Sequence, residues 1–127
     1  MHDDTVTENR INRELWERIG PAEVIRRHPL QVTALHLESE PVPVHQLDPG
    51  DFGPIAPGQR WGRPWGTTWF SVSGQLPEEV AAHSALEIHA DIGFSGAMAG
   101  FQAEGSVYVD GLIRCGVHPR RRSIDVE

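Results

Sequence analysis

Histidine and carboxylate side chains are the first candidates for chemistry in this sequence, because together they can bind a metal ion. His89 and Asp91 lie on either side of Ala90, so both side chains share one face if this segment is a strand, and His36 lies in a second candidate strand. A cupin-like site requires two histidines one residue apart followed by a glutamate, and the sequence has no such pair. Half-solvated strands carry His and Asp routinely, so we expect an exposed strand face and no metal site in this chain.

Motifs for nucleophilic catalysis are also absent. The sequence contains no G-x-S-x-G elbow and no phosphate-binding loop, and its one cysteine, Cys115, has no base at a recognisable spacing. Carboxylates are plentiful, but in an acidic protein their number alone identifies no acid–base pair. The sequence therefore predicts no catalytic residue.

Tryptophans give the most distinctive pattern. Residues 58–70 read GQRWGRPWGTTWF and place Trp61, Trp65 and Trp69 at four-residue intervals. Exposed aromatic rings can stack on the apolar face of a pyranose, which would make this segment a carbohydrate-binding platform. The alternative is that the rings pack against the rest of the domain, and this is favoured because large aromatic side chains are more often buried than used as ligand sites.

Composition indicates one globular domain and excludes several partners. The chain has 127 residues, of which 39% are hydrophobic and 23% are charged, with a net charge of -7. Its only basic cluster is Arg120-Arg121-Arg122, so we expect no nucleic-acid partner. No apolar run is long enough to span a bilayer, and the acidic N-terminus does not resemble a secretion signal. A single cysteine fits a reducing compartment, so we expect a cytoplasmic protein without membrane contact.

The N-terminal segment is predicted to form a packing helix that carries no catalytic or binding residue. Residues 5–8 have the S/T-x-x-E form of a capping box, and Gly20-Pro21 is expected to end the helix. Between them, apolar residues recur at four-residue spacing, at Ile11, Leu15 and Ile19. Glutamates and arginines occupy the other positions, so we expect a solvated charged face and docking by the apolar face.

From residue 32 onward the hydrophobic period changes to two, which indicates antiparallel strands. We expect strands at 32–38, 67–73 and 85–92, and a hairpin over 106–115 that turns at Asp110-Gly111. Six prolines and five glycines predict an irregular connection over residues 41–66. Short strands with Pro- and Gly-rich loops are typical of a β-sandwich.

Three motifs in order carry a resemblance to a known family: W-G-T-T-W-F at 65–70, G-F-Q followed by E-G at 100–105, and G-V-H-P-R at 116–120. On these the chain resembles the N-terminal domain of bacterial and fungal cytosolic α-mannosidases of glycoside hydrolase family 38, from the helical arm to Arg122. The resemblance implies a parent enzyme that removes terminal α-mannosyl units with retention of configuration. It also implies a zinc ion, held by two His and two Asp, and an Asp nucleophile, all in a separate barrel domain.

The barrel's zinc motif, H-x-D-x-x-W, is not present here, because residues 89–94 read HADIGF without the tryptophan. No catalytic residue, zinc ligand or cofactor is therefore assigned to this chain. We expect a mainly β fold, a jelly-roll-like or galactose-binding-like antiparallel sandwich at 31–127, preceded by a helical arm at 1–30. Family members continue with further strands, so the sandwich is expected to be truncated at its C-terminus.

Two functions follow from this interpretation. One is an accessory domain of an α-mannosidase that packs on the catalytic barrel and has no activity alone; the other is a free-standing carbohydrate-binding module for mannose-containing oligosaccharides that uses Trp61, Trp65 and Trp69. A third role is an arm that forms homo-oligomers. Pro119 restricts the backbone around it, so Arg120 is expected to make a fixed contact at the domain junction, with Arg121 and Arg122 solvated.

Overall fold

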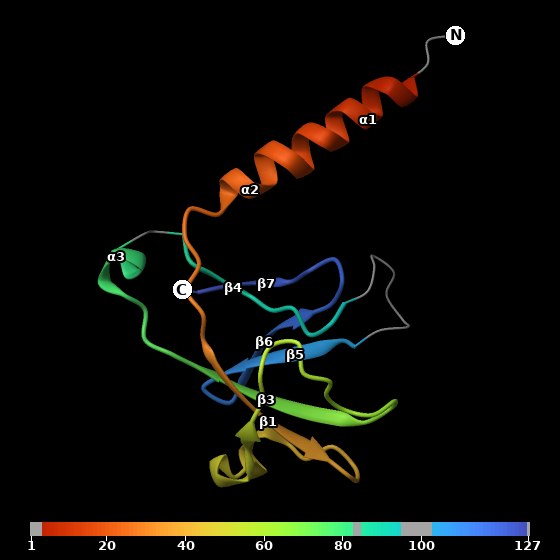
Figure 1. Ribbon diagram of the computed structural model, residues 1–127. Helices are drawn as coiled ribbons and strands as arrows, with labels where there is room; N and C mark the ends of the chain where they lie inside the picture. The colour runs from red at the N-terminus through yellow and green to blue at the C-terminus, as the bar shows by residue number, and fades with distance from the viewer. Residues whose placement is uncertain (1–3, 83–84, 95–102, 127) are drawn as a thin grey trace.

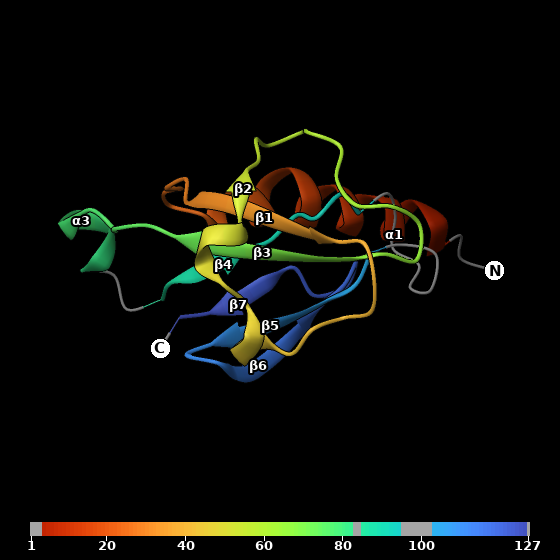
Figure 2. The same cartoon turned by 90° about the horizontal axis from the view of Figure 1, so that it is seen from below.

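The computed structural model describes residues 4–82, 85–94 and 103–126 of the chain. A helical arm comes first and antiparallel β-sheets follow. Figure 1 shows the arm projecting away from the strands, and Figure 2 shows β1 and β3 in one layer with β5, β6 and β7 in another. The motif residues Gly100, Phe101 and Gln102 lie outside the described part of the chain.

The arm is one continuous helix made of three segments: α1 (Asp4–Glu14), a π-helical turn (Leu15–Ile19) and α2 (Gly20–Glu23). The prediction that Gly20-Pro21 ends the helix is wrong. A proline ring normally collides with the carbonyl group four residues earlier, and the wider π turn immediately before Gly20 makes room for Pro21. The capping-box prediction is also wrong, because Thr5 already lies inside α1.

The first sheet has the order β2-β1-β3 and contains β1 (Gln31–Leu37), β2 (Gly53–Pro54) and β3 (Thr67–Ser73). β1 and β3 pair antiparallel along their whole length, with Leu35 opposite Trp69 and Ala34 opposite Phe70. The predictions for 32–38 and 67–73 are therefore confirmed to within one residue. The two-residue β2 lies at the sheet edge, where the missing amide of Pro54 is tolerated.

Two antiparallel pairs form the second group of strands. β4 (Glu87–His89) pairs with β7 (Ser123–Asp125), and β5 (Gly105–Val109) pairs with β6 (Leu112–Val117). The strand predicted over 85–92 is shorter in the structure, because only residues 87–89 pair with the three-residue strand β7. The remaining elements are short turns: two 3-10 helices (Val44–Gln46 and Pro49–Asp51) and α3 (Glu78–Ala81).

The turn between β5 and β6 has the geometry expected from its sequence. Asp110 and Gly111 both adopt positive φ angles, 51° and 77°, as a type I′ turn requires. Asp tolerates this region better than most residues, and Gly has no Cβ to collide with the backbone. The predicted hairpin and its turn are confirmed.

The domain buries little of its surface. The buried aliphatic side chains among the described residues are Ala34 and Val117, which are 7% and 5% exposed. The chain exposes 10843 Å². A compact monomer of 14.1 kDa exposes roughly 6,700 Å² by the usual scaling of surface with mass, so this surface is about 1.6 times larger. Fifteen large hydrophobic side chains are exposed among the described residues, so apolar surface is available for packing against other polypeptide.

We expect Gly111→Ala to destabilise the hairpin by about 1 kcal/mol, because alanine is strained at the positive φ of this turn. Gly53→Ala is the matched control, because a Cβ there meets no atom within 4 Å and the backbone is not left-handed. It should change the free energy of unfolding by less than about 0.5 kcal/mol. Denaturant unfolding of the two variants measures the difference, and equal losses would contradict the assigned turn.

Candidate functional site

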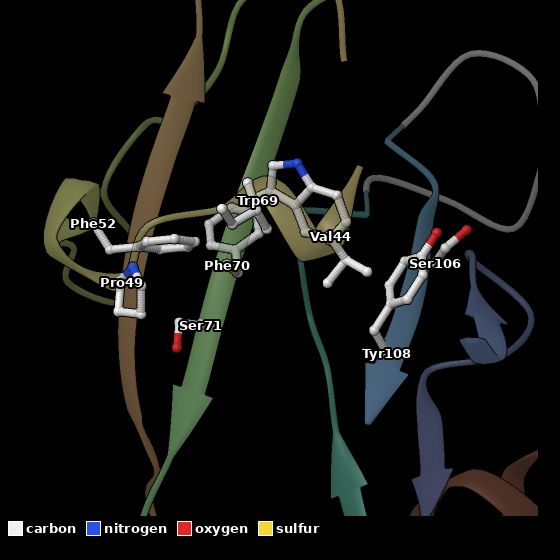
Figure 3. Close-up of a pocket in the computed structure, with 9 residues that line it drawn as sticks. Val44, Pro49, Phe52, Trp69, Phe70, Ser71, Ser106 and Tyr108 are labelled. Carbon is white, nitrogen blue, oxygen red and sulfur yellow. The ribbon is translucent and has the colours of Figure 1, made fainter. Parts of the chain in front are cut away.

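An open cavity of about 330 Å³ lies between strands β3 and β5 and residues 44–52, which contain the two 3-10 helices (Figure 3). Its lining combines apolar and aromatic side chains with three hydroxyl groups and contains no charged side chain. The lining residues are Val44, Leu47, Pro49, Phe52, Trp69, Phe70, Ser71, Ser106 and Tyr108. A cavity of this size and character suits a small neutral ligand or an inserted side chain.

Trp69 of β3 bridges the two layers at this cavity. Its indole ring lies 5.3 Å from the ring of Tyr108 on β5, with the planes inclined by 55°. The indole Nε1 is buried and has no hydrogen-bond partner within the described chain. An unpaired buried donor costs about 1 to 3 kcal/mol, so this N–H lowers the stability of the contact between the two layers.

Trp61 has a different environment. Its ring packs edge-on against Phe70, with ring centres 4.9 Å apart. It lines a second cavity of about 330 Å³ that is polar, with His36, Arg60 and Arg63 among the lining residues. The His36 Nδ1 and the Thr68 hydroxyl lie 3.0 Å apart across the β1–β3 ladder.

The loop that carries Trp61 is held to β1 by Arg63. The Arg63 guanidinium donates to the backbone carbonyl of Glu38 and lies 3.8 Å from the Glu38 carboxylate. Both side chains are largely exposed, so the ion pair itself adds little stability, and its role is to fix the position of the loop.

Trp65 is fully exposed, at 105% of the reference area, and has a φ of 63°, which is rare for a tryptophan. It lines neither cavity. The structure therefore places Trp61, Trp65 and Trp69 in three separate environments: a polar cavity, solvent, and the aromatic cavity between the layers. It brings no two of them into one cavity.

The His–Asp segment forms a turn. The Asp91 carboxylate accepts hydrogen bonds from the backbone N–H groups of Gly93 (3.0 Å) and Phe94 (3.3 Å). These bonds, with smaller contributions from the nearby charges of Arg122 and His89, hold the pKa of Asp91 below the ordinary value of 3.8. Within the described residues no cluster of three or more His, Cys, Asp or Glu could hold a metal ion.

The basic segment after β6 forms a tight turn. The backbones of His118 and Arg121 exchange hydrogen bonds of 3.0 and 2.9 Å, with Pro119 at the second position of the turn and Arg120 exposed at the third. The Arg120 N–H donates to the His118 ring at 3.3 Å. The turn therefore presents Arg120 at a corner with a fixed backbone.

Arg122 does not match its prediction. It was expected to be solvated, but its side chain is half-buried: Nε donates to the carbonyl of Pro119 at 3.2 Å, and the guanidinium lies 5.1 Å from the centre of the Phe94 ring. A cation over an aromatic face is stabilising. This contact connects the 118–122 turn to the turn after β4.

Most residues of the aromatic cavity carry no signal in the sequence that marks them as a site, and Phe52, Ser106 and Tyr108 are examples. Tyr108 is the only tyrosine in the chain and lies in a predicted hairpin, so its presence in a strand was predictable. Its position opposite Trp69 was not, because that depends on how the two layers stack. Phe52 comes from the irregular connection, where no periodicity indicates which side chains turn inward.

Taken together, antiparallel β-sheets with an uncharged aromatic cavity, and with no metal-binding cluster among the described residues, define a β-rich module without evident catalytic groups. The family described as "Alpha-mannosidase, jelly roll domain", the Ams1-like first domain, matches residues 28–127, and the chain belongs to this family. The match begins after the helical arm, so the arm lies outside it. No curated protein and no solved structure matches the chain. None of the described helices is long and apolar enough to cross a membrane.

Proposed function

We propose that this chain is an accessory jelly-roll domain of an α-mannosidase that hydrolyses terminal α-mannosyl residues, and that it has no activity by itself. The observation that carries the proposal is the combination of the family match with the large exposed apolar surface. A module with few buried side chains is stabilised when it packs on a larger body, here the catalytic barrel of the parent enzyme. Zinc would belong to that barrel.

We expect the 127-residue chain to release no product from an aryl α-mannoside, with or without added zinc, because hydrolysis requires an acid and a nucleophile flanking the glycosidic bond. The complete enzyme that contains this domain should hydrolyse the same substrate under the same conditions. Asp91→Asn serves as the control variant, because residues 89–91, His-Ala-Asp, match the H-x-D start of the family's zinc motif. Hydrolysis by the isolated chain that disappears in Asp91→Asn would overturn the proposal.

Arg120 is the residue we propose for the contact with the barrel. It is exposed on a turn whose backbone is fixed by Pro119 and by the paired backbones of His118 and Arg121. A guanidinium at such a corner can bind a carboxylate through two parallel hydrogen bonds, which a lysine cannot reproduce.

In the complete enzyme, Arg120→Lys is expected to lower the free energy of unfolding by roughly 1.5 to 3 kcal/mol, the range for hydrogen bonds to charged groups. Arg121→Lys, at the next exposed position, should have no comparable effect. Thermal unfolding and mannosidase activity measured on both variants provide the comparison. Identical behaviour of the two variants would remove the case for a junction contact at Arg120.

Carbohydrate binding is the second candidate function, and the aromatic cavity of Figure 3 favours it. A pyranose is neutral and has an apolar face and many hydroxyl groups. The cavity offers aromatic rings, the hydroxyls of Ser71, Ser106 and Tyr108, and no charge. The rings of Trp69 and Tyr108 would contact the apolar face of the sugar.

We expect methyl α-mannoside to change the tryptophan fluorescence of the chain in a saturable way. Trp69→Phe should weaken the binding by roughly tenfold, which corresponds to about 1.4 kcal/mol, because the smaller ring covers less of the sugar's apolar face. Trp65→Ala, which removes a ring that lines neither cavity, should leave the affinity unchanged. The opposite order of effects would support a surface platform around Trp65, and an unsaturable response would exclude a sugar site in the cavity.

A further inference from the structure

Trp65 combines a strained backbone with a side chain that touches nothing. Among the described residues other than glycine, a positive φ occurs at Trp65 and at Asp110. The β5–β6 turn accounts for Asp110, because aspartate tolerates this conformation. A tryptophan has no such tolerance, and the full exposure of its side chain shows that no packing compensates for the strain. Trp65 therefore contributes nothing to the stability of the domain on its own.

Other exposed apolar side chains lack this combination. The prediction that the arm docks by its Ile11, Leu15 and Ile19 face is wrong within the described chain, where these side chains are 45% to 53% exposed. Their backbone is helical and shows no positive φ. Strain that the local structure does not need is typical of functional positions, so Trp65 is the stronger candidate for a contact.

The turn that carries Trp65 is rigid. The Gly66 N–H donates to the Arg63 carbonyl at 3.0 Å, and Pro64 fixes the backbone at the second position of this turn. A Cβ at residue 66 would lie 2.7 Å from Cγ of Arg63, so the two segments are as close as a glycine allows. Trp65 occupies the third position, where a positive φ normally requires glycine or asparagine. The turn thus fixes the direction in which the indole projects.

The rest of the 58–66 loop is anchored as well. The Trp61 ring packs on Phe70, and Arg63 donates to the backbone carbonyl of Glu38. Figure 2 shows the connection between β2 and β3 on the side of the β1–β3 layer that faces away from β5, β6 and β7. A side chain that is already positioned loses little conformational freedom on binding, which favours affinity.

The exposure of Trp65 indicates the shape of its partner. A tryptophan that serves as a stacking platform rests one face of its ring on the protein and leaves the other face open. Trp65 is exposed at 105% of the reference area, so both faces and the edges of the ring are open. Only a pocket that encloses the ring would cover all of this area. Tryptophans inserted into such pockets are the commonest anchors of protein interfaces.

Charge indicates the chemistry around that pocket. Residues 58–66 contain two arginines and no acidic residue, whereas the whole chain has a net charge of -7. Arg63 is paired with Glu38, but Arg60 lines the polar cavity beside Trp61 and makes no hydrogen bond or ion pair within the described chain. A carboxylate on the partner would complement the Arg60 guanidinium.

We propose that Trp65 is the anchor by which this chain docks on the catalytic barrel of the parent enzyme. The indole inserts into an apolar pocket of the barrel, and a carboxylate at the rim of that pocket faces Arg60. The inference rests on the accessory role proposed above and adds to it a contact on a different segment from the Arg120 turn.

Hydroxyl-radical oxidation, read by mass spectrometry of the peptide that contains residue 65, tests the insertion directly. A tryptophan peptide added to each sample calibrates the radical dose. Trp65 should be oxidised roughly tenfold more slowly in the complete enzyme than in the 127-residue chain, because an inserted anchor is desolvated. Equal rates in the two proteins would overturn the proposal.

Two pairs of variants test the anchor and the charge. Trp65→Gly should leave the 127-residue chain as stable as before, because it relieves strain and removes no contact, but should lower the melting temperature of the complete enzyme. Leu112→Ala is the matched control, since Leu112 is 71% exposed without a positive φ, and it should change neither protein. In the complete enzyme, Arg60→Glu should increase the oxidation of Trp65, whereas Arg60→Lys keeps the charge and should not.

Three outcomes would overturn the anchor: Trp65→Gly that destabilises the isolated chain as much as the complete enzyme, Leu112→Ala that destabilises the enzyme equally, or protection of Trp65 that appears only when methyl α-mannoside is added. Activity of the same enzyme sample on an aryl α-mannoside tests the proposed function separately. Protection of Trp65 in an inactive complete protein would support the anchor and contradict the proposed activity. An active enzyme with unprotected Trp65 would overturn the anchor alone.

Discussion

The seven-residue antiparallel ladder between β1 and β3 determines where the aromatic side chains of this domain lie. Successive residues of a strand point to opposite faces, so Trp69 turns toward Tyr108 on β5 while Phe70 meets the ring of Trp61. A slip of one residue in the register would exchange these two environments. It would move the indole away from the interlayer cavity and leave the 58–66 loop without its aromatic anchor. The cavity and the position of the loop are thus both consequences of one register.

The small buried core limits what this ladder can stabilise alone. Side chains of β1 and β3 are mostly half-buried, and Ala34 is the one fully buried residue in either strand. Burial of apolar area stabilises a protein by roughly 25 cal/mol per Å². A half-buried ring therefore contributes less than a fully buried ring. The apolar area that stays exposed can contribute to stability only when another surface covers it. The buried Nε1 of Trp69 has no hydrogen-bond partner within the described chain, which lowers the stability further.

Local sequence patterns predicted the elements well where local interactions decide them. The period of two at 67–73 and the Asp110-Gly111 turn both appear as expected, since backbone geometry and side-chain alternation are set by neighbouring residues. Pro21 was misjudged because a π turn just before it relieves the collision that normally ends a helix. The predicted strand at 67–73 separates Trp69 from Trp61 and Trp65, which lie in the predicted irregular connection. The rings that Trp61 and Trp69 contact, Phe70 and Tyr108, were not predictable, because those contacts join segments that are distant in the sequence.

The separation between the arm and the sheets has a thermodynamic consequence. Residues 24–30, which form no regular element, connect Glu23 to Gln31, and the ion pair between Arg26 and Glu79 in this region is exposed, with the two atoms 3.2 Å apart. Exposed pairs of this kind contribute little free energy, so the arm and the sheets are only weakly coupled. The arm can therefore open locally while the β1–β3 ladder stays paired. Because the described sheets bury no residue of the arm, a contact that the sheets make with another surface does not compete with the arm for the same residues.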